Sequence, residues 1–94
     1  MCDYSEVVKN CRKLERAGAK LFPIGKSLQG KDLLCLRMGC GKKTIIIIGS
    51  VHAREHATAT LVLMQAEYAL ARVKKGEGTL YFLPCANPDG ADIA

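Results

Sequence analysis

Hydrophobic and polar residues recur along this chain with helical and strand-like periods, and the two periods together predict an α/β fold. Residues 4–17 carry apolar side chains at the spacing of an amphipathic helix. Asp3 or Ser5 can cap the start of this helix, and Gly18 suits its end. A second helical pattern covers residues 57–75 and is apolar around most of its girth, which predicts that this helix packs between layers.

Four segments have the composition of strands. Residues 20–25 and 32–38 predict a hairpin, and Pro23 makes the first of them an edge strand or a strand with a bulge. Residues 44–48 are a β-branched run without polar alternation, which is typical of a central strand covered on both faces. Residues 79–84 predict a further strand, parallel to the third because a helix of crossover length separates them.

The composition fits one small domain. The chain has 94 residues, of which 49% are hydrophobic and 24% charged, a balance typical of globular proteins. We therefore expect a single domain over residues 1–94, with a partial mixed sheet of about four strands and two helices.

Charge and hydropathy exclude two classes of partner. The net charge of +5 is spread without a dense basic run, and few aromatic residues are present to stack bases, so nucleic acid is not expected. No apolar stretch approaches the length of a membrane span, so no membrane is expected. Residues 1–4 lack the apolar region of a signal peptide, which favours a cytoplasmic location.

The spacing of the cysteines does not match a zinc-binding motif. The five cysteines are irregularly spaced, and no Cys-x-x-Cys pair occurs, although Cys35 and Cys40 could in principle share a metal. Reduced, partly buried thiols are the preferred interpretation.

The most informative residues follow the third strand. His52 and Glu55 are three apart where a strand gives way to a helix, so an imidazole nitrogen and a carboxylate can meet on one cation. In open α/β sheets, sites form at the carboxyl ends of strands. These two residues would supply two-thirds of a His2Glu zinc site, the type that leaves a position open for water.

Neighbouring residues leave alternatives open. Arg54 can bind an anionic or carbonyl group of a substrate, or it can be a solvated arginine at a helix start. His56 is four residues after His52, but Ala53 stands where the His-Glu-x-x-His pattern needs its glutamate. Gly49-Ser50 could form a phosphate-binding loop, although the spacing of a P-loop is missing.

Three motifs in order give the chain a resemblance to a known family. Residues 24–33 look like a Gly-x-Ser-x-x-Gly-Arg hairpin, residues 48–55 like a first zinc motif, and residues 87–90 are the turn Asn-Pro-Asp-Gly. From about Tyr4 onward the chain resembles the N-terminal half of the catalytic domain of the M14 zinc carboxypeptidases, the carboxypeptidase A-like enzymes. Two departures are Lys31 in place of arginine and His56 in place of tryptophan.

The resemblance implies a function and a set of site residues. His52 and Glu55 would be the first two zinc ligands, and Arg54 would contact the substrate, a peptide with a C-terminal carboxylate. The family fold is an eight-stranded mixed sheet between helices, so this chain would form half of an α/β/α sandwich.

The resemblance also implies what the 94 residues lack. The family's third zinc ligand, its carboxylate-binding residues and its catalytic glutamate follow the Asn-Pro-Asp-Gly turn at a distance that this chain does not reach. We therefore expect a zinc-dependent metallocarboxypeptidase in the form of a fragment that is inactive alone and has no catalytic residue of its own. The alternatives are a non-catalytic zinc-binding or self-associating module, using an exposed sheet edge, and a small α/β domain with an anion-binding loop.

Overall fold

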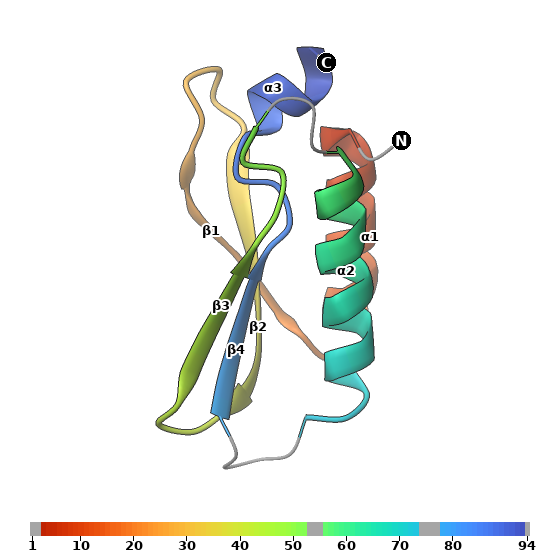
Figure 1. The fold of residues 1–94 in the computed structure, drawn as a ribbon, viewed down its shortest axis with the longest axis vertical. Helices are drawn as coiled ribbons and strands as arrows, with labels where there is room; N and C mark the ends of the chain where they lie inside the picture. The colour runs from red at the N-terminus through yellow and green to blue at the C-terminus, as the bar shows by residue number, and fades with distance from the viewer. Residues whose placement is uncertain (1–2, 53–55, 74–77, 94) are drawn as a thin grey trace.

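A computed structural model gives the fold, and it describes residues 3–52, 56–73 and 78–93. Within these residues the chain forms three helices and four strands (Figure 1). In chain order they are α1 (Tyr4–Arg16), β1 (Lys20–Lys26), β2 (Asp32–Cys40), β3 (Thr44–Ile48), α2 (His56–Leu70), β4 (Gly78–Leu83) and α3 (Pro88–Ile93).

Helix α1 begins and ends as its sequence predicts. The Asp3 carboxylate accepts a hydrogen bond from the Glu6 amide at 3.0 Å, which caps the first turn. At the other end Gly18 has a φ of 119°, a conformation that favours glycine and stops the helix. The apolar stripe of α1 buries Val7, Cys11 and Leu14.

The four strands form one mixed sheet in the order β1-β2-β4-β3. Strands β1 and β2 form the expected antiparallel hairpin, β2 pairs antiparallel with β4, and β3 pairs parallel with β4. Strand β1 is an edge strand whose register shifts between Pro23 and Lys26, because proline cannot donate to the ladder. The hairpin, the parallel pair and the edge position of Pro23 are thereby confirmed.

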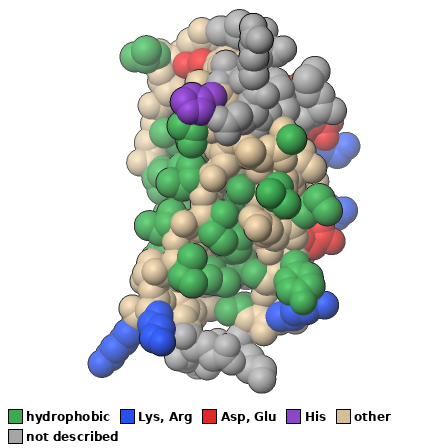
Figure 2. Space-filling view, in the orientation of Figure 1, with side chains coloured by type: hydrophobic (Ala, Val, Ile, Leu, Met, Phe, Trp, Pro, Cys, Tyr) green, Lys and Arg blue, Asp and Glu red, His purple; other side chains and the backbone are tan. Residues whose placement is uncertain are grey.

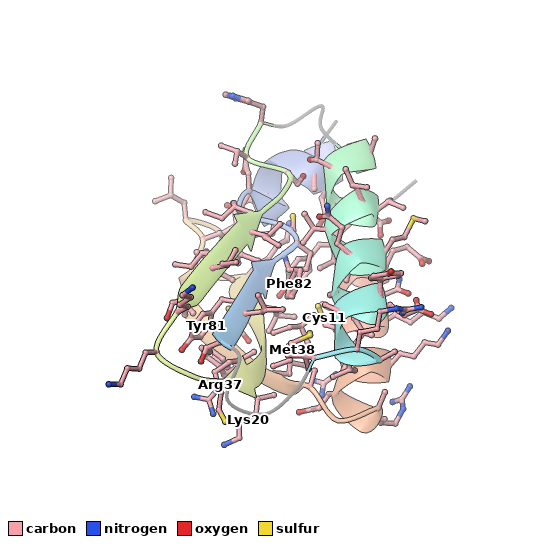
Figure 3. All side chains as sticks on the ribbon, turned by 60° about the horizontal axis from the view of Figure 1, so that its bottom comes forward. Cys11, Lys20, Arg37, Met38, Tyr81 and Phe82 are labelled. Atoms are coloured by element: carbon pink, nitrogen blue, oxygen red, sulfur yellow. The ribbon has the colours of Figure 1, made fainter. Side chains whose placement is uncertain are left out.

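Helices α1 and α2 cover the same face of the sheet (Figure 1). The core lies between them and the sheet, and Figure 3 shows Met38 and Phe82 pointing into it toward Cys11 of α1. Arg37 and Tyr81, the residues before these two on β2 and β4, point to the opposite face, as the alternation of side chains along a strand requires.

Strand β3 is an edge strand of this sheet, where its sequence predicted a covered central one. Its only partner within the described residues is β4, and Ile45, Ile46 and Ile48 are 55%, 63% and 52% exposed. An unbroken apolar run indicates that both faces of a strand are suited to burial, but it does not identify the segments that bury them.

Helix α2 packs on one side only, and this differs from the predicted position between layers. Ala59, Val62, Leu63 and Ala66 are buried, whereas Leu61, Met64 and Tyr68 on its outer side are more than half exposed. The structure describes no layer outside α2. No helix in the described ranges is long and apolar enough to cross a lipid bilayer.

A third helix stands where the sequence predicted only a turn. Asn87 caps it by accepting a hydrogen bond from the Gly90 amide at 3.0 Å through its side-chain oxygen. Pro88 occupies the first helical position, where its missing N–H costs nothing. The same residue types serve a turn and a helix start, so residues 87–90 predicted the local bend but not the helix.

Candidate metal centre

The carboxyl ends of β3 and β4, the turn between β1 and β2, and helix α3 lie at the same end of the molecule (Figure 1). His52 is four residues beyond the end of β3 and is exposed. A site at this end would therefore be built on two parallel strands, as expected for an open α/β sheet.

Gly49 permits a close approach of the end of β3 to its neighbours. A Cβ atom at this position would lie 2.8 Å from the Thr58 carbonyl oxygen, 2.8 Å from a methyl of Val62 and 2.9 Å from the Pro84 carbonyl oxygen. Such distances are essentially never seen for a real side chain. Glycine thus lets β3, α2 and the end of β4 meet directly below the His52 loop.

Ser50 continues the chain in a conformation that is rare for a residue with a side chain. Its φ is 52°, and its backbone is held on both sides. The Ser50 amide donates to the Thr58 hydroxyl at 2.7 Å, and the Ser50 carbonyl accepts from the Asn87 amide at 3.0 Å. The Ser50 hydroxyl oxygen is buried and has no hydrogen-bond partner among the described residues.

These hydrogen bonds argue against the anion-binding loop. The Gly49 amide donates to the Leu83 carbonyl at 2.9 Å, and the Ser50 amide donates to Thr58. The N–H groups of Gly49 and Ser50 are therefore already used within the protein, whereas an anion site needs donors that point at the ligand.

Helix α3 ties the hairpin turn to this end of the sheet. The Asp89 carboxylate accepts from the Ser27 hydroxyl at 2.7 Å and from the Gln29 amide at 3.1 Å. One turn later, Asp92 forms a 2.7 Å ion pair with Lys31, and that hydrogen bond is the main cause that lowers the pKa of the Asp92 carboxyl. The same bond raises the pKa of Lys31.

The structural role of Asp89 and Ser27 was not predicted, although both residues belong to the motifs that carried the resemblance. Only their membership of these motifs marked the two residues in the sequence. An Asp at the second position of a helix and a Ser at the first position of a turn are both common in proteins. Only the fold brings these two residues together, across 62 positions of sequence.

Of the predicted site residues, His52 is placed by the structure, and Arg54 and Glu55 lie outside the described residues. Within the described ranges, no group of three or more His, Cys, Asp or Glu side chains could hold a metal ion. The donor types of His52 and Glu55, an imidazole nitrogen and a carboxylate oxygen, are those zinc takes in catalytic sites. These two residue types suit zinc in chemistry and would make up two of the three ligands of a His2Glu set.

Within the described residues the cysteines give no metal site. Cys11, Cys35 and Cys85 are buried thiols and Cys40 is an exposed one, and burial raises the pKa of Cys35. A shared metal between Cys35 and Cys40 lacks further ligands in the described part of the chain.

In sequence, the chain is similar to known zinc carboxypeptidases. The profile of the family described as zinc carboxypeptidase matches residues 5–94. Carboxypeptidase Z of Rattus norvegicus is 27% identical over 92 residues, which cover 81% of this chain and 14% of that protein.

Solved structures show the same fold. The metallo-carboxypeptidase from Burkholderia cenocepacia superposes with a TM-score of 0.82 at 17% identity, over 94% of this chain and 28% of its own. The metallo-carboxypeptidase from Pseudomonas aeruginosa, solved with (2-guanidinoethylmercapto)succinic acid, has a TM-score of 0.80 at 23% identity, over 94% of this chain and 26% of its own. The 94 residues thus span less than a third of each of these proteins, and the chain belongs to the zinc carboxypeptidase family.

Proposed function

We propose that this chain is the zinc-binding N-terminal part of a metallocarboxypeptidase, with His52 and Glu55 as zinc ligands and Arg54 as a substrate-contacting residue. The observation that carries the proposal is the position of His52 at the carboxyl end of β3, in a chain of the zinc carboxypeptidase family. Glu55 follows three residues later in the sequence, and in this proposal it binds the same cation.

The chemistry of the proposed reaction is hydrolysis of a peptide bond. Zinc, when bound, polarises the scissile carbonyl and makes a bound water more acidic. For this His52 offers an imidazole nitrogen, and Glu55 offers a carboxylate oxygen. Arg54 offers a planar, permanently charged guanidinium, which suits a carboxylate or carbonyl group.

The proposed substrate is a peptide with a free C-terminal carboxylate. The Pseudomonas aeruginosa relative was solved with a guanidino-substituted succinic acid, an anionic ligand that is consistent with such a substrate. We also propose that these 94 residues are inactive alone, since they span only 26% of that relative and since two protein ligands hold zinc less firmly than three.

The test is zinc affinity by calorimetry. Cys2 and Cys40 are first changed to Ser, so that their thiols do not compete for the metal. His52→Ala is expected to abolish binding or weaken it more than tenfold, and the matched His56→Ala is expected to leave it within about twofold. Equal affinities in wild type and His52→Ala would reject the ligand assignment. Release of a C-terminal residue from a peptide by the wild-type chain would reject the proposed inactivity.

A second candidate function is self-association, and a specific surface favours it. Figure 2 shows hydrophobic side chains over both β3 and α2 on one face. A groove of about 350 Å³ lies between the two elements and is lined by Ile45, Tyr68, Val73 and Leu80 among others. The proposed occupant of this surface is a second copy of the chain, paired through the free edge of β3.

The distribution of charge favours an antiparallel pair of β3 strands about a twofold axis. Strand β3 carries no charge, and Lys43 lies directly before it. Parallel pairing would place the two Lys43 residues side by side. Antiparallel pairing centred on Ile46 would separate them by roughly 20 Å at a strand rise of about 3.4 Å per residue. That distance exceeds the screening length of about 8 Å at physiological salt.

Burial of exposed apolar side chains would drive this association. The side chains on β3 and α2 that are more than half exposed are Ile45, Ile46, Ile48, Leu61, Met64 and Tyr68. Sedimentation equilibrium should detect a concentration-dependent dimer that Ile46→Lys abolishes. Leu28→Lys places the same charge on a fully exposed leucine of the hairpin turn and should leave the dimer intact. A wild-type chain that stays monomeric, or loss of the dimer with Leu28→Lys only, would refute this second function.

A further inference from the structure

We infer that Asn87 and Asp89 are positioning residues for the metal loop, and that they act through the backbone of Ser50. This inference rests on the proposed function, because it assigns a purpose to the loop that carries His52. The three motifs of the sequence are far apart in the chain, yet hydrogen bonds join them into one unit at one end of the molecule.

The unit begins at the hairpin turn. The Ser27 hydroxyl donates to Asp89 at 2.7 Å and accepts from the Lys31 amide at 3.0 Å. It therefore links helix α3 to the backbone of the hairpin turn. The second oxygen of Asp89 accepts from the Gln29 amide at 3.1 Å. The Asp89 side chain is 17% exposed. A carboxylate that is largely shielded and accepts from two groups of one turn holds α3 in a fixed place against that turn.

Asn87 carries this constraint from α3 to the strand ends. Its side-chain oxygen caps α3 at the Gly90 amide, and its carbonyl accepts from the Ala91 amide at 3.0 Å. Its own amide donates to the Ser50 carbonyl at 3.0 Å. One residue therefore belongs both to the start of α3 and to the loop that leaves β3.

Ser50 receives the constraint in a strained conformation. Its φ of 52° is unfavourable for a residue with a side chain, and its buried hydroxyl lacks a partner among the described residues. Glycine would avoid both penalties. Hydrogen bonds to Thr58 and from Asn87 hold the Ser50 backbone in this conformation. The Ser50 backbone thereby fixes the direction of the chain toward His52, two residues later.

The inference predicts that stability and metal binding change in opposite directions in Ser50→Gly. Relief of strain should raise the unfolding free energy, while greater backbone freedom should weaken zinc binding about tenfold, as for other groups that orient a ligand. A merely structural role for Ser50 would move both quantities in the same direction. The measurements are calorimetric zinc affinity and urea unfolding, in the background with Cys2 and Cys40 changed to Ser.

A pair of carboxylates on α3 provides the matched comparison. Asp89→Ala removes the hydrogen bonds from the Ser27 hydroxyl and the Gln29 amide and a 3.7 Å ion pair with Lys31, whereas Asp92→Ala leaves both hydrogen bonds in place and removes the 2.7 Å ion pair with Lys31 and the contact with the Tyr4 amide. Both variants should be less stable than wild type. Only Asp89→Ala should speed the exchange of the Ser50 and His52 amides relative to the core amides, and only Asp89→Ala should weaken zinc binding more than threefold.

The two proposals fail in distinguishable ways. If the wild-type chain binds no zinc, the proposed function fails. The positioning role of Asn87 and Asp89 is then still tested in the metal-free protein by amide exchange of residues 50–52. Faster exchange there in Ser50→Gly and Asp89→Ala, but not in Asp92→Ala, supports the positioning role. Unchanged exchange in Ser50→Gly and Asp89→Ala, or equal effects of Asp89→Ala and Asp92→Ala, overturns it.

Discussion

Gly49→Ala is the most informative single substitution outside the proposed metal ligands. The added methyl group would meet two carbonyl oxygens, of Thr58 and Pro84, and a methyl group of Val62, all at 2.8–2.9 Å. Two of these three atoms belong to the backbone, so a change of side-chain rotamer cannot relieve the overlap. The end of β3 must move away from α2 and β4, which also displaces the loop to His52.

The expected cost follows from the number and kind of contacts. Overpacking of a closely packed site costs about 1–3 kcal/mol, and the upper part of that range applies because backbone atoms must shift. For a domain of this size, a loss of about 2–3 kcal/mol lowers the melting temperature by roughly 10–20 °C.

Gly25→Ala is the matched control for this substitution. A Cβ atom at Gly25 would meet only a methyl of Leu33 at 3.8 Å, an ordinary van der Waals contact. This variant should therefore be within about 0.5 kcal/mol of wild type, or slightly more stable because alanine restricts the unfolded chain. Urea unfolding followed by circular dichroism measures both variants. Equal stabilities of Gly49→Ala and Gly25→Ala would refute the close approach of β3, α2 and β4.

Three further predictions follow from single residues. Ser50→Gly should raise the unfolding free energy by about 1 kcal/mol, since it removes the positive-φ strain; a loss of stability in urea unfolding would contradict this. The lowered pKa of Asp92 contributes stability that is fully present above the ordinary value of 3.8 and is lost as the pH falls through the folded-state pKa; an acid titration of Asp92→Asn, compared with wild type, should lack that component. Cys40 is exposed and Cys35 is buried with a raised pKa, so iodoacetamide at pH 8 should alkylate Cys40 much faster; site-resolved mass spectrometry showing equal rates would argue against the burial of Cys35.

Local sequence patterns predicted the elements well where burial itself sets the pattern. Leu34, Leu36 and Met38 alternate in sequence, and in the structure they line the helix-facing side of β2. The same is true of the stripe on α1, because a period of two or 3.6 reports directly which side faces the core. The β-branched run of residues 44–48 predicted its strand with the correct limits.

The sequence could not predict features that depend on which segments meet. The position of β3 at an edge depends on what lies beside it, and side-chain periodicity carries no such information. The strained backbone of Ser50 was also not predictable, since serine has no preference for positive φ and its conformation is imposed by Thr58 and Asn87. His52 was identified from its residue type and its place after a strand, while the ties of Asn87 and Asp89 required the fold.

The central claim is that zinc binds through His52, and nitrogen NMR of the imidazole rings during a zinc titration tests it most directly. The chain has two histidines, so each ring can be assigned by a single substitution. The account predicts that one ring nitrogen of His52 shifts strongly as zinc is added, while the nitrogens of His56 stay near their metal-free positions. A shift of the His56 nitrogens with His52 unchanged, or no shift of either ring, would contradict the assignment of this motif as the metal centre.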